Sequence, residues 1–177
     1  MKIIIRLFFI ISLLPLGSSP LFAQDEHPTG RAVMPASAAP AYANIPDDDA
    51  TMDQAVQKAR KNLGKFLAAL KSPAPGQTGF AIKRPFVQGD KVEHIWLRDV
   101  TYDGKAFHGV IDNAPTEIQN VQLDSKANAA PGEISDWMYL ENGRLVGGYT
   151  VRALCRKMTP AKKRDFEKAA GFRLGKN

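Results

Sequence analysis

The sequence contains very few of the residues that build disulfide frameworks or metal sites. It has one cysteine, which excludes an intramolecular disulfide, and three histidines, with no C-x-x-C or H-x-x-x-H unit. It also lacks a phosphate-binding loop, a G-x-S-x-G elbow and a Walker motif. We therefore expect neither a metal nor another cofactor, and the commonest hydrolase and nucleotide-binding signatures are excluded.

Long hydrophobic runs are also missing, apart from one at the start of the chain. Lys2 and Arg6 accompany an apolar run that reaches Leu16, and small residues then lead to Ala23. This order is typical of a secretory signal peptide, and the run falls short of the roughly 20 residues that span a bilayer. We expect residues 1–23 to be removed, which would make the mature bacterial protein periplasmic or secreted.

The rest of the chain has the composition of one globular domain, since 44% of the residues are hydrophobic and 24% are charged. Residues 24–50 are rich in Ala and Pro and predict a flexible tether. A single domain is expected over 51–171, followed by a basic tail over 172–177. Residues 156–177 carry a net charge of +6, which is compatible with a weak contact with an anionic surface but more often marks a solvated helical face. No nucleic-acid-binding motif is present.

Two kinds of periodicity predict the fold of this domain. Apolar residues recur at helical spacing from Met52 to Leu70, which predicts one amphipathic helix. Shorter helical patterns cover 151–158 and 160–170. Between them, alternating residues predict strands over 80–86, 92–102 and 105–112 and a further hairpin over 137–146. The expected class is α+β: a small antiparallel sheet built from hairpins, packed by an N-terminal amphipathic helix and short C-terminal helices.

Two turn dipeptides set the expected strand register. Asp103-Gly104 and Asn142-Gly143 both favour a two-residue type I′ turn, which requires a positive φ at both positions. In the first hairpin this pairs Tyr102 with Lys105. Counting back then places Trp96 opposite Ile111, on the same core face as Val100 and Phe107.

Five segments resemble the uncharacterised YegJ-like family of bacterial proteins. They read F-A-I-K-R-P-F over 80–86, V-E-H-I-W-L over 92–97, G-V-I-D-N-A-P over 109–115, I-S-D-W-M-Y over 134–139 and N-G-R-L-V-G-G-Y-T-V-R over 142–152. The resemblance implies a small α+β domain of a family found both in the cytosol and exported. It implies no activity, because none is established for the family.

One group of polar and aromatic residues is a candidate binding site. Asp136 precedes a hairpin that begins with Trp137, and a glycine pair before Tyr149 can bring the next helix back to that edge. A polar group beside a tryptophan costs desolvation unless it is paired, so the cluster is either a buried pair that locks the fold or a binding site. The candidate residues are Glu93, His94, Asp136, Trp137, Tyr149 and Arg152.

Two classes of function follow from these residues. A non-enzymatic binding or interaction module in the cell envelope, with an unknown protein or small molecule as its partner, fits the single core and the aromatic-rich polar segments. The alternative is a small envelope hydrolase that uses His94 with Asp136 or Glu133. Glu93 and His94 are adjacent in a strand and point to opposite faces, which disfavours a joint catalytic role.

The signal peptide gives the first testable prediction. We expect the protein purified from a bacterial host to begin at Gln24, because the charged, apolar and small-residue regions occur in signal-peptide order. Intact-mass and N-terminal peptide mass spectrometry measure this directly. Recovery of the chain with Met1 to Ala23 still attached would contradict the prediction.

Overall fold

The computed structural model describes residues 50–175. The predicted signal peptide, almost all of the predicted tether and the last two residues of the basic tail lie outside this range. Within it, every helix is too short or too polar to cross a membrane.

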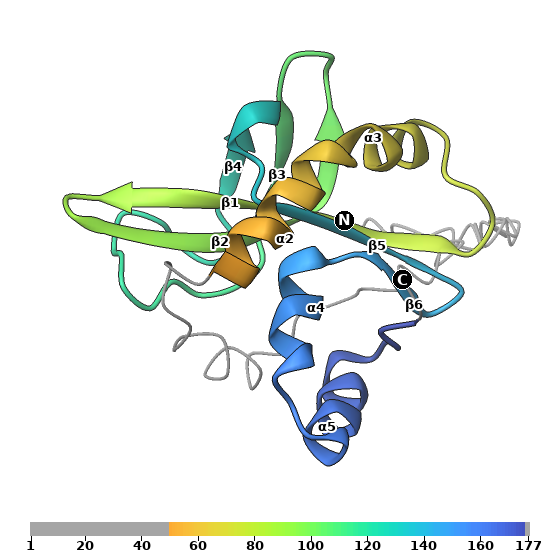
Figure 1. Cartoon of the computed structure of the whole chain (residues 1–177). Helices are drawn as coiled ribbons and strands as arrows, with labels where there is room; N and C mark the ends of the chain where they lie inside the picture. The colour runs from red at the N-terminus through yellow and green to blue at the C-terminus, as the bar shows by residue number, and fades with distance from the viewer. Residues whose placement is uncertain (1–49, 176–177) are drawn as a thin grey trace, which may run out of the picture.

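Six strands form one antiparallel sheet in the order β4-β3-β2-β1-β5-β6 (Figure 1). The α+β class predicted from the sequence is therefore confirmed. The strands are β1 (Gln77–Gln88), β2 (Lys91–Tyr102), β3 (Phe107–Ile111), β4 (Lys126–Ala129), β5 (Asp136–Glu141) and β6 (Arg144–Gly147). The helices are α2 (Ala50–Lys61), α3 (Leu63–Lys71), α4 (Tyr149–Arg156) and α5 (Pro160–Ala170), with a short 3-10 turn, η2 (Pro131–Glu133).

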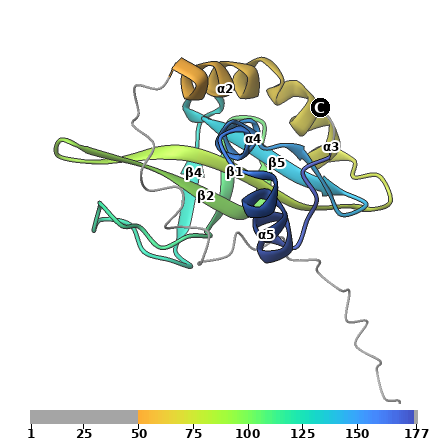
Figure 2. The same ribbon diagram turned by 60° about the horizontal axis from the view of Figure 1, so that its bottom comes forward.

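Helices α2 and α3 lie on one face of the sheet and α5 on the other (Figure 2). The core accordingly forms two clusters of buried residues, one on each face. The α2/α3 face contains Phe66 of α3 together with Ile82, Leu97, Phe107 and Trp137 of the strands. In addition, Trp137 Nε1 donates a hydrogen bond to the carbonyl oxygen of Ala59 at 2.8 Å, which ties α2 to β5. These contacts fix the helical layer on its sheet.

The second cluster, on the α5 face, is smaller and lies toward one end of the sheet. Ala81 and Met138 contribute from β1 and β5, and Val151, Cys155 and Phe166 contribute from α4 and α5. Trp96 is the only β2 residue in the cluster, and no residue of β3 or β4 belongs to it. Within residues 50–175, no helix packs on the α5 face of β3 and β4.

The C-terminal segment covers one edge of the sheet. Leu145 N donates to the carbonyl oxygen of Arg173 at 2.8 Å, and Arg173 N donates to that of Gly143 at 3.0 Å. Arg144 and Arg173 thus form a parallel bridge beside β6. The unpaired hydrogen-bonding groups of an edge strand are satisfied here by the chain itself.

Several local predictions are confirmed. Asn142 and Gly143 have φ values of 50° and 72° and join Glu141 to Arg144 through a two-residue turn. Helix α5 begins after Thr159, whose side chain accepts a hydrogen bond from Lys162 N, and it ends before Gly171 at φ 71°. In both places the residue chemistry alone determines the backbone conformation.

The predicted first helix is wrong in one respect, because it is divided at Asn62. The side-chain amide of Asn62 donates to the carbonyl oxygen of Lys58 at 2.8 Å, and the backbone there has φ −101° and ψ 10°. Asn competes for backbone hydrogen bonds in this way and is a poor interior residue of a helix. Two helices, α2 and α3, replace the single one.

The predicted turn at Asp103-Gly104 is also wrong. Tyr102 pairs with Phe107, so the loop has four residues, and the Asp103 carboxylate accepts from the backbone N–H groups of Lys105 and Ala106 at 2.7 Å each. An Asp side chain that caps its own loop favours this wider turn. The Asp103 carboxylate thus stabilises a four-residue loop, whereas the preference of Asp-Gly for a type I′ turn takes only the two backbone conformations into account.

The predicted position of Trp96 is a further error. Leu97, rather than Trp96, pairs with Ile111, and the register shifts between Arg98 and Thr101, where Asp99 has φ 53°. A bulge of one residue reverses the facing of every side chain before it. Trp96 is consequently buried on the α5 face, while Val100 and Phe107 lie on the α2/α3 face as predicted.

The register gives a stability prediction. Phe107 is fully buried and lies against Phe66, with ring centroids 6.0 Å apart. We expect Phe107→Ala to lower the free energy of unfolding by about 3 to 5 kcal/mol, since it empties an aromatic site. Chemical denaturation measures the change, with Val92→Ala as a control because Val92 is exposed in the same sheet. A loss below about 1 kcal/mol would contradict the assigned packing.

Candidate functional site

Asp136, one of the predicted site residues, joins β5 to the start of α4. Its carboxylate is fully buried and accepts hydrogen bonds from Trp137 N at 2.8 Å, Tyr149 N at 3.0 Å and Thr150 N at 2.8 Å. The Thr150 hydroxyl donates a fourth at 2.6 Å. Burial raises the pKa of the Asp136 carboxyl, while the hydrogen bonds from Thr150 and the charge of Lys83 act in the opposite direction. Both oxygens are therefore occupied by the helix N-terminus that they cap.

Trp137 and the glycine pair complete this junction. Trp137 is fully buried, and the ring of Tyr149 meets it edge-on with centroids 5.5 Å apart. A Cβ atom at Gly147 would collide with the Trp137 carbonyl and ring, and Gly147 has φ 71°. The glycine allows β6 to turn tightly over the indole, so the aromatic pair belongs to the interior of the domain.

Glu93 stabilises the loop that connects β3 to β4. Its carboxylate accepts from Thr116 N at 2.9 Å and Glu117 N at 2.9 Å, and from the Thr116 hydroxyl at 3.1 Å. Ile118, two residues further on, is buried in the cluster of the α2/α3 face. The Glu93 side chain thus holds this loop against the sheet.

His94 lies on the other face of β2, next to the start of β5. Its Nδ1 is 2.9 Å from the Ser135 hydroxyl, which lies 3.1 Å from the Lys83 carbonyl oxygen and donates to it. Glu133 is engaged elsewhere, since its carboxylate accepts from Ala130 N at 2.7 Å and pairs with Arg84 at 3.6 Å. These contacts do not assemble His94 with a carboxylate that is open to a substrate.

The structure therefore separates the predicted site residues into two groups. Glu93 and His94 contact different loops at the β1–β2 hairpin, whereas Asp136, Trp137, Tyr149 and Arg152 gather where α4 begins. Cys155 is buried, and burial raises the pKa of its thiol to about 11. Among the described side chains, no three of His, Cys, Asp or Glu lie close enough to hold a metal ion.

The sequence analysis missed a second surface, which we call the open sheet face. It is the α5 face of β2, β3 and β4, where directly paired residues form two rows across three strands. Cross-strand partners point to the same side of a sheet, so the two rows share that face. One row is Arg98, Val110 and Lys126, and the other is Thr101, His108 and Asn128.

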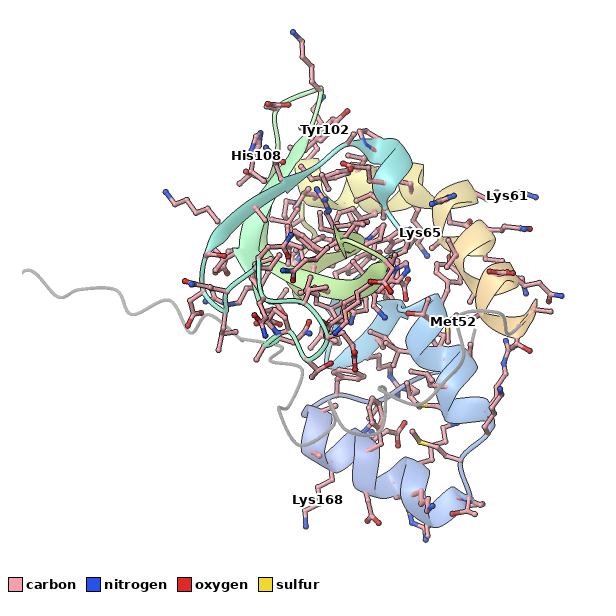
Figure 3. The ribbon with its side chains drawn as sticks, turned by 90° about the vertical axis from the view of Figure 1, so that its left-hand side faces the viewer. Met52, Lys61, Lys65, Tyr102, His108 and Lys168 are labelled. Atoms are coloured by element: carbon pink, nitrogen blue, oxygen red, sulfur yellow. The ribbon has the colours of Figure 1, made fainter. Side chains whose placement is uncertain are left out.

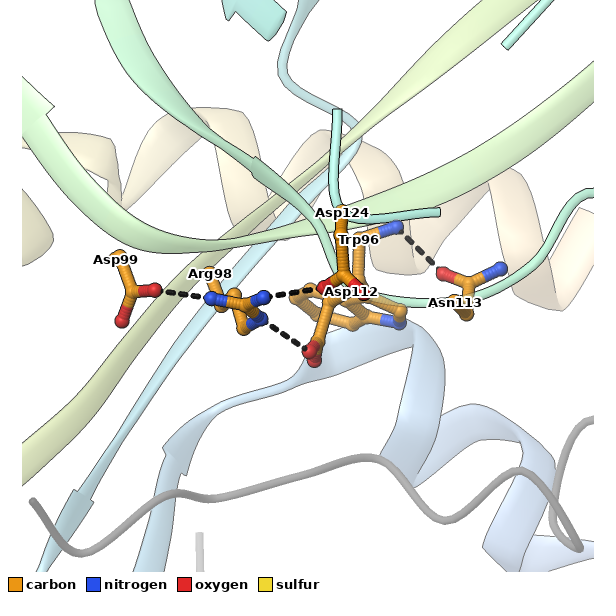
Figure 4. A network of polar contacts seen from close by, with 6 residues as sticks. All are labelled: Trp96, Arg98, Asp99, Asp112, Asn113 and Asp124. Carbon is orange, nitrogen blue, oxygen red and sulfur yellow. Dashed lines mark hydrogen bonds and ion pairs between the residues drawn. The ribbon is translucent and has the colours of Figure 1, made fainter. Parts of the chain in front are cut away.

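A network of charges holds one side of this face in place (Figure 4). Arg98 forms ion pairs with Asp99, with Asp124 at 2.5 Å and with the buried carboxylate of Asp112 at 3.2 Å. Burial opposes the charge of Arg98, but the hydrogen bonds and charges of the three carboxylates outweigh it and raise the pKa of the guanidinium. Asp99 and Asp124 also have positive φ values, 53° and 63°, which are uncommon outside glycine.

His108 forms the other side of the open sheet face. Its Nε2 lies 2.9 Å from the Asp103 carboxylate, and hydrogen bonds from Ala106 and His108 hold the pKa of that carboxyl well below its usual range. Figure 3 shows His108 and Tyr102 at the end of the sheet opposite Lys168 of α5. Between the two sides lies a hollow of about 440 Å³ that includes Asp99, Thr101, His108 and Lys126 in its lining.

Comparisons with known proteins identify relatives of this chain. Residues 49–174 match the model of a family described as "Uncharacterized protein conserved in bacteria (DUF2314)". The chain is 36% identical over 107 residues to the uncharacterized protein YegJ of Escherichia coli (strain K12), covering 60% of this chain and 69% of that protein. It is 32% identical over 135 residues to a putative ankyrin repeat protein of Neisseria meningitidis serogroup B, covering 72% of this chain and 53% of that protein. No solved structure shows a significant match.

The junction at Asp136 gives a prediction about stability. Asp136→Asn should lower the free energy of unfolding by at least about 2 kcal/mol, because an amide has one accepting oxygen and either the Thr150 donors or the N–H groups of Trp137 and Tyr149 lose their acceptor. Denaturant unfolding of the variant measures this loss. Asp165→Asn, on an exposed position of α5, is the matched control and should change little. Equal stabilities of the two variants would show that the carboxylate does not hold α4.

Proposed function

The chain belongs to the bacterial DUF2314 family, and on this premise we propose that it is a non-enzymatic binding module that acts in the cell envelope. The order of charged, apolar and small residues at its N-terminus supports export. The open sheet face supports binding. We further propose that this face, rather than the cluster around Asp136, recognises the partner.

The observation that carries this proposal is the fixed array of polar side chains on the open sheet face. Arg98 is held by three carboxylates from β2 and the loop after β3, so its position is set before any partner arrives. Side chains fixed in this way lose little conformational entropy on binding. The bulge at Asp99 and the positive φ of two residues add backbone strain, which proteins keep mainly at functional sites.

The shape of the hollow favours recognition over catalysis. Its lining residues Thr101, His108, Lys126 and Asn128 are all exposed, so water reaches every polar group in it. Catalytic sites generally exclude water, which strengthens the electrostatic interactions inside them. An open, rigid and polar sheet surface is better suited to a protein partner with complementary polar groups.

One relative is consistent with a module of this kind. In the Neisseria protein, a putative ankyrin repeat protein, the matched segment covers 53% of the length. Ankyrin-type arrays present extended surfaces that bind other proteins.

A photo-crosslinking experiment tests the proposal. A photoreactive amino acid at Thr101 of the mature protein should trap a protein partner from an envelope extract, whereas one at Ala169 on exposed α5 should not. Adding Asp99→Asn should reduce the Thr101 product at least about fivefold, since it removes a charge while Asn still tolerates a positive φ. Mass spectrometry of the crosslinked band measures both effects.

The reduced crosslinking yield supports the proposal only if the Asp99→Asn variant folds as the parent protein does. The melting temperature of the Asp99→Asn variant should stay within about 4 °C of the parent, as is usual for a surface change. An Asp165→Asn variant at another exposed aspartate should keep the full crosslinking yield. Equal trapping from Thr101 and Ala169, or an unchanged yield with Asp99→Asn, would overturn the proposal.

A further inference from the structure

Helices α2 and α4 enclose a small cleft that is separate from the open sheet face. Each helix contributes residues one turn apart, and the buried Ala55 and Ala153 lie at its base. Its volume is about 60 Å³. The other lining residues are Thr51, Gln54 and Lys58 from α2 and Tyr149, Arg152 and Arg156 from α4.

The lining of this α2/α4 cleft is cationic. Lys58, Arg152 and Arg156 line it, and none of its lining residues is acidic. In the part of the chain that the structure describes, no carboxylate forms an ion pair with any of the three. Arg152 and Arg156 also stand four residues apart in α4, where two like charges destabilise a helix. The cleft therefore concentrates positive charge at a cost to the free protein.

Arg152 is a fixed cation in this cleft. Its guanidinium donates to the carbonyl oxygens of Gly147 at 2.8 Å, Leu145 at 2.6 Å and Gly175 at 3.4 Å, so neutral groups hold it in place. Burial lowers its pKa, while Tyr149 and the charge of Asp136 act in the opposite direction. Lys58 and Arg156 are exposed and reach the same cleft from two helices. The cleft therefore combines one positive group held by hydrogen bonds, Arg152, with two exposed positive side chains, Lys58 and Arg156.

We propose that the α2/α4 cleft binds a phosphate-sized oxyanion, held by Arg152 and closed over by Lys58 and Arg156. Guanidinium groups suit phosphate geometry, and the amide of Gln54 and the hydroxyl of Tyr149 add neutral hydrogen-bonding groups to the lining. A volume of about 60 Å³ has room for roughly four water molecules, which is the size of one small tetrahedral anion. Larger ligands would extend out of the cleft and be bound by this group alone.

This oxyanion chemistry has two sources in a cell envelope: free phosphate with its soluble monoesters, and the headgroups of anionic phospholipids. Both present tetrahedral phosphate oxygens to a cationic cleft. The proposal is independent of the partner proposed for the open sheet face, because the two sets of lining residues do not overlap.

A pair of isosteric charge variants on α2 tests the cleft. Gln54→Glu places a carboxylate in the lining, whereas Gln57→Glu makes the same change at an exposed position of α2 outside it. Isothermal titration calorimetry of the folded mature protein with inorganic phosphate should show saturable binding. The Kd should rise at least about tenfold with Gln54→Glu and less than about twofold with Gln57→Glu.

A lipid arm distinguishes the two sources. Co-sedimentation with vesicles of phosphatidylglycerol, compared with phosphatidylcholine vesicles, is measured for the same two variants. If Gln54→Glu abolishes vesicle binding but not phosphate binding, the cleft is assigned to a lipid headgroup. If Gln54→Glu abolishes phosphate binding but not vesicle binding, the cleft is assigned to the soluble anion. Either result supports the proposal.

A second pair of variants separates a specific cleft from general attraction to positive charge. Lys58→Ala with Arg156→Ala removes two cations from the cleft, and Lys162→Ala with Lys168→Ala removes two exposed cations from α5. The first pair should weaken binding at least about tenfold and the second should leave it within about twofold. Equal weakening by both pairs, equal effects of Gln54→Glu and Gln57→Glu, or an absence of saturable binding in both arms would overturn the proposal.

Discussion

The buried carboxylate of Asp136 is the contact on which the arrangement of this domain depends. It replaces water at the N-terminus of α4 and so lets that helix start directly against β5, where its first amide groups would otherwise lack acceptors. With α4 fixed, Tyr149 meets Trp137 on one side and Val151 and Cys155 enter the cluster of the α5 face on the other. This polar interaction thereby positions a helix that contributes residues to both apolar clusters.

The helices cover the sheet unequally, and this produces two surfaces of different character. At the β5–β6 end both faces are packed, and a narrow cationic cleft lies between α2 and α4. At the β3–β4 end one face has no helix, and its residues are correspondingly polar and exposed. An antiparallel sheet tolerates one solvated face because its residues alternate between core and water. The same architecture thus provides a shallow surface and a small cleft within about 126 described residues.

The sequence predicted those parts of the fold that depend on neighbouring residues. Asn142-Gly143 determines its turn by backbone chemistry, whereas at Asp103-Gly104 a side-chain hydrogen bond changes the loop and pattern alone does not reveal it. Trp96 was placed on the wrong face because nothing local marks Asp99 as a bulge. The six predicted site residues have side chains suited to binding. Asp136 and Trp137 are nevertheless interior residues, because their polar groups form hydrogen bonds with Thr150 and Ala59 inside the domain. Arg98 and His108 were not singled out, since their partners lie up to 26 residues away.

The C-terminal segment around Arg173 has a consequence for how copies of this protein can associate. Because Arg173 bridges to Arg144, the β6 side of the sheet already has a strand-like neighbour, and within residues 50–175 only β4 remains as an outer strand. A sheet with one open side can join another sheet only once, through a two-fold contact, and cannot continue into a fibre. β4 is four residues long and carries Lys126, which weakens even that single contact. The C-terminal segment therefore limits the backbone groups of β6 that are open to pairing with a second sheet.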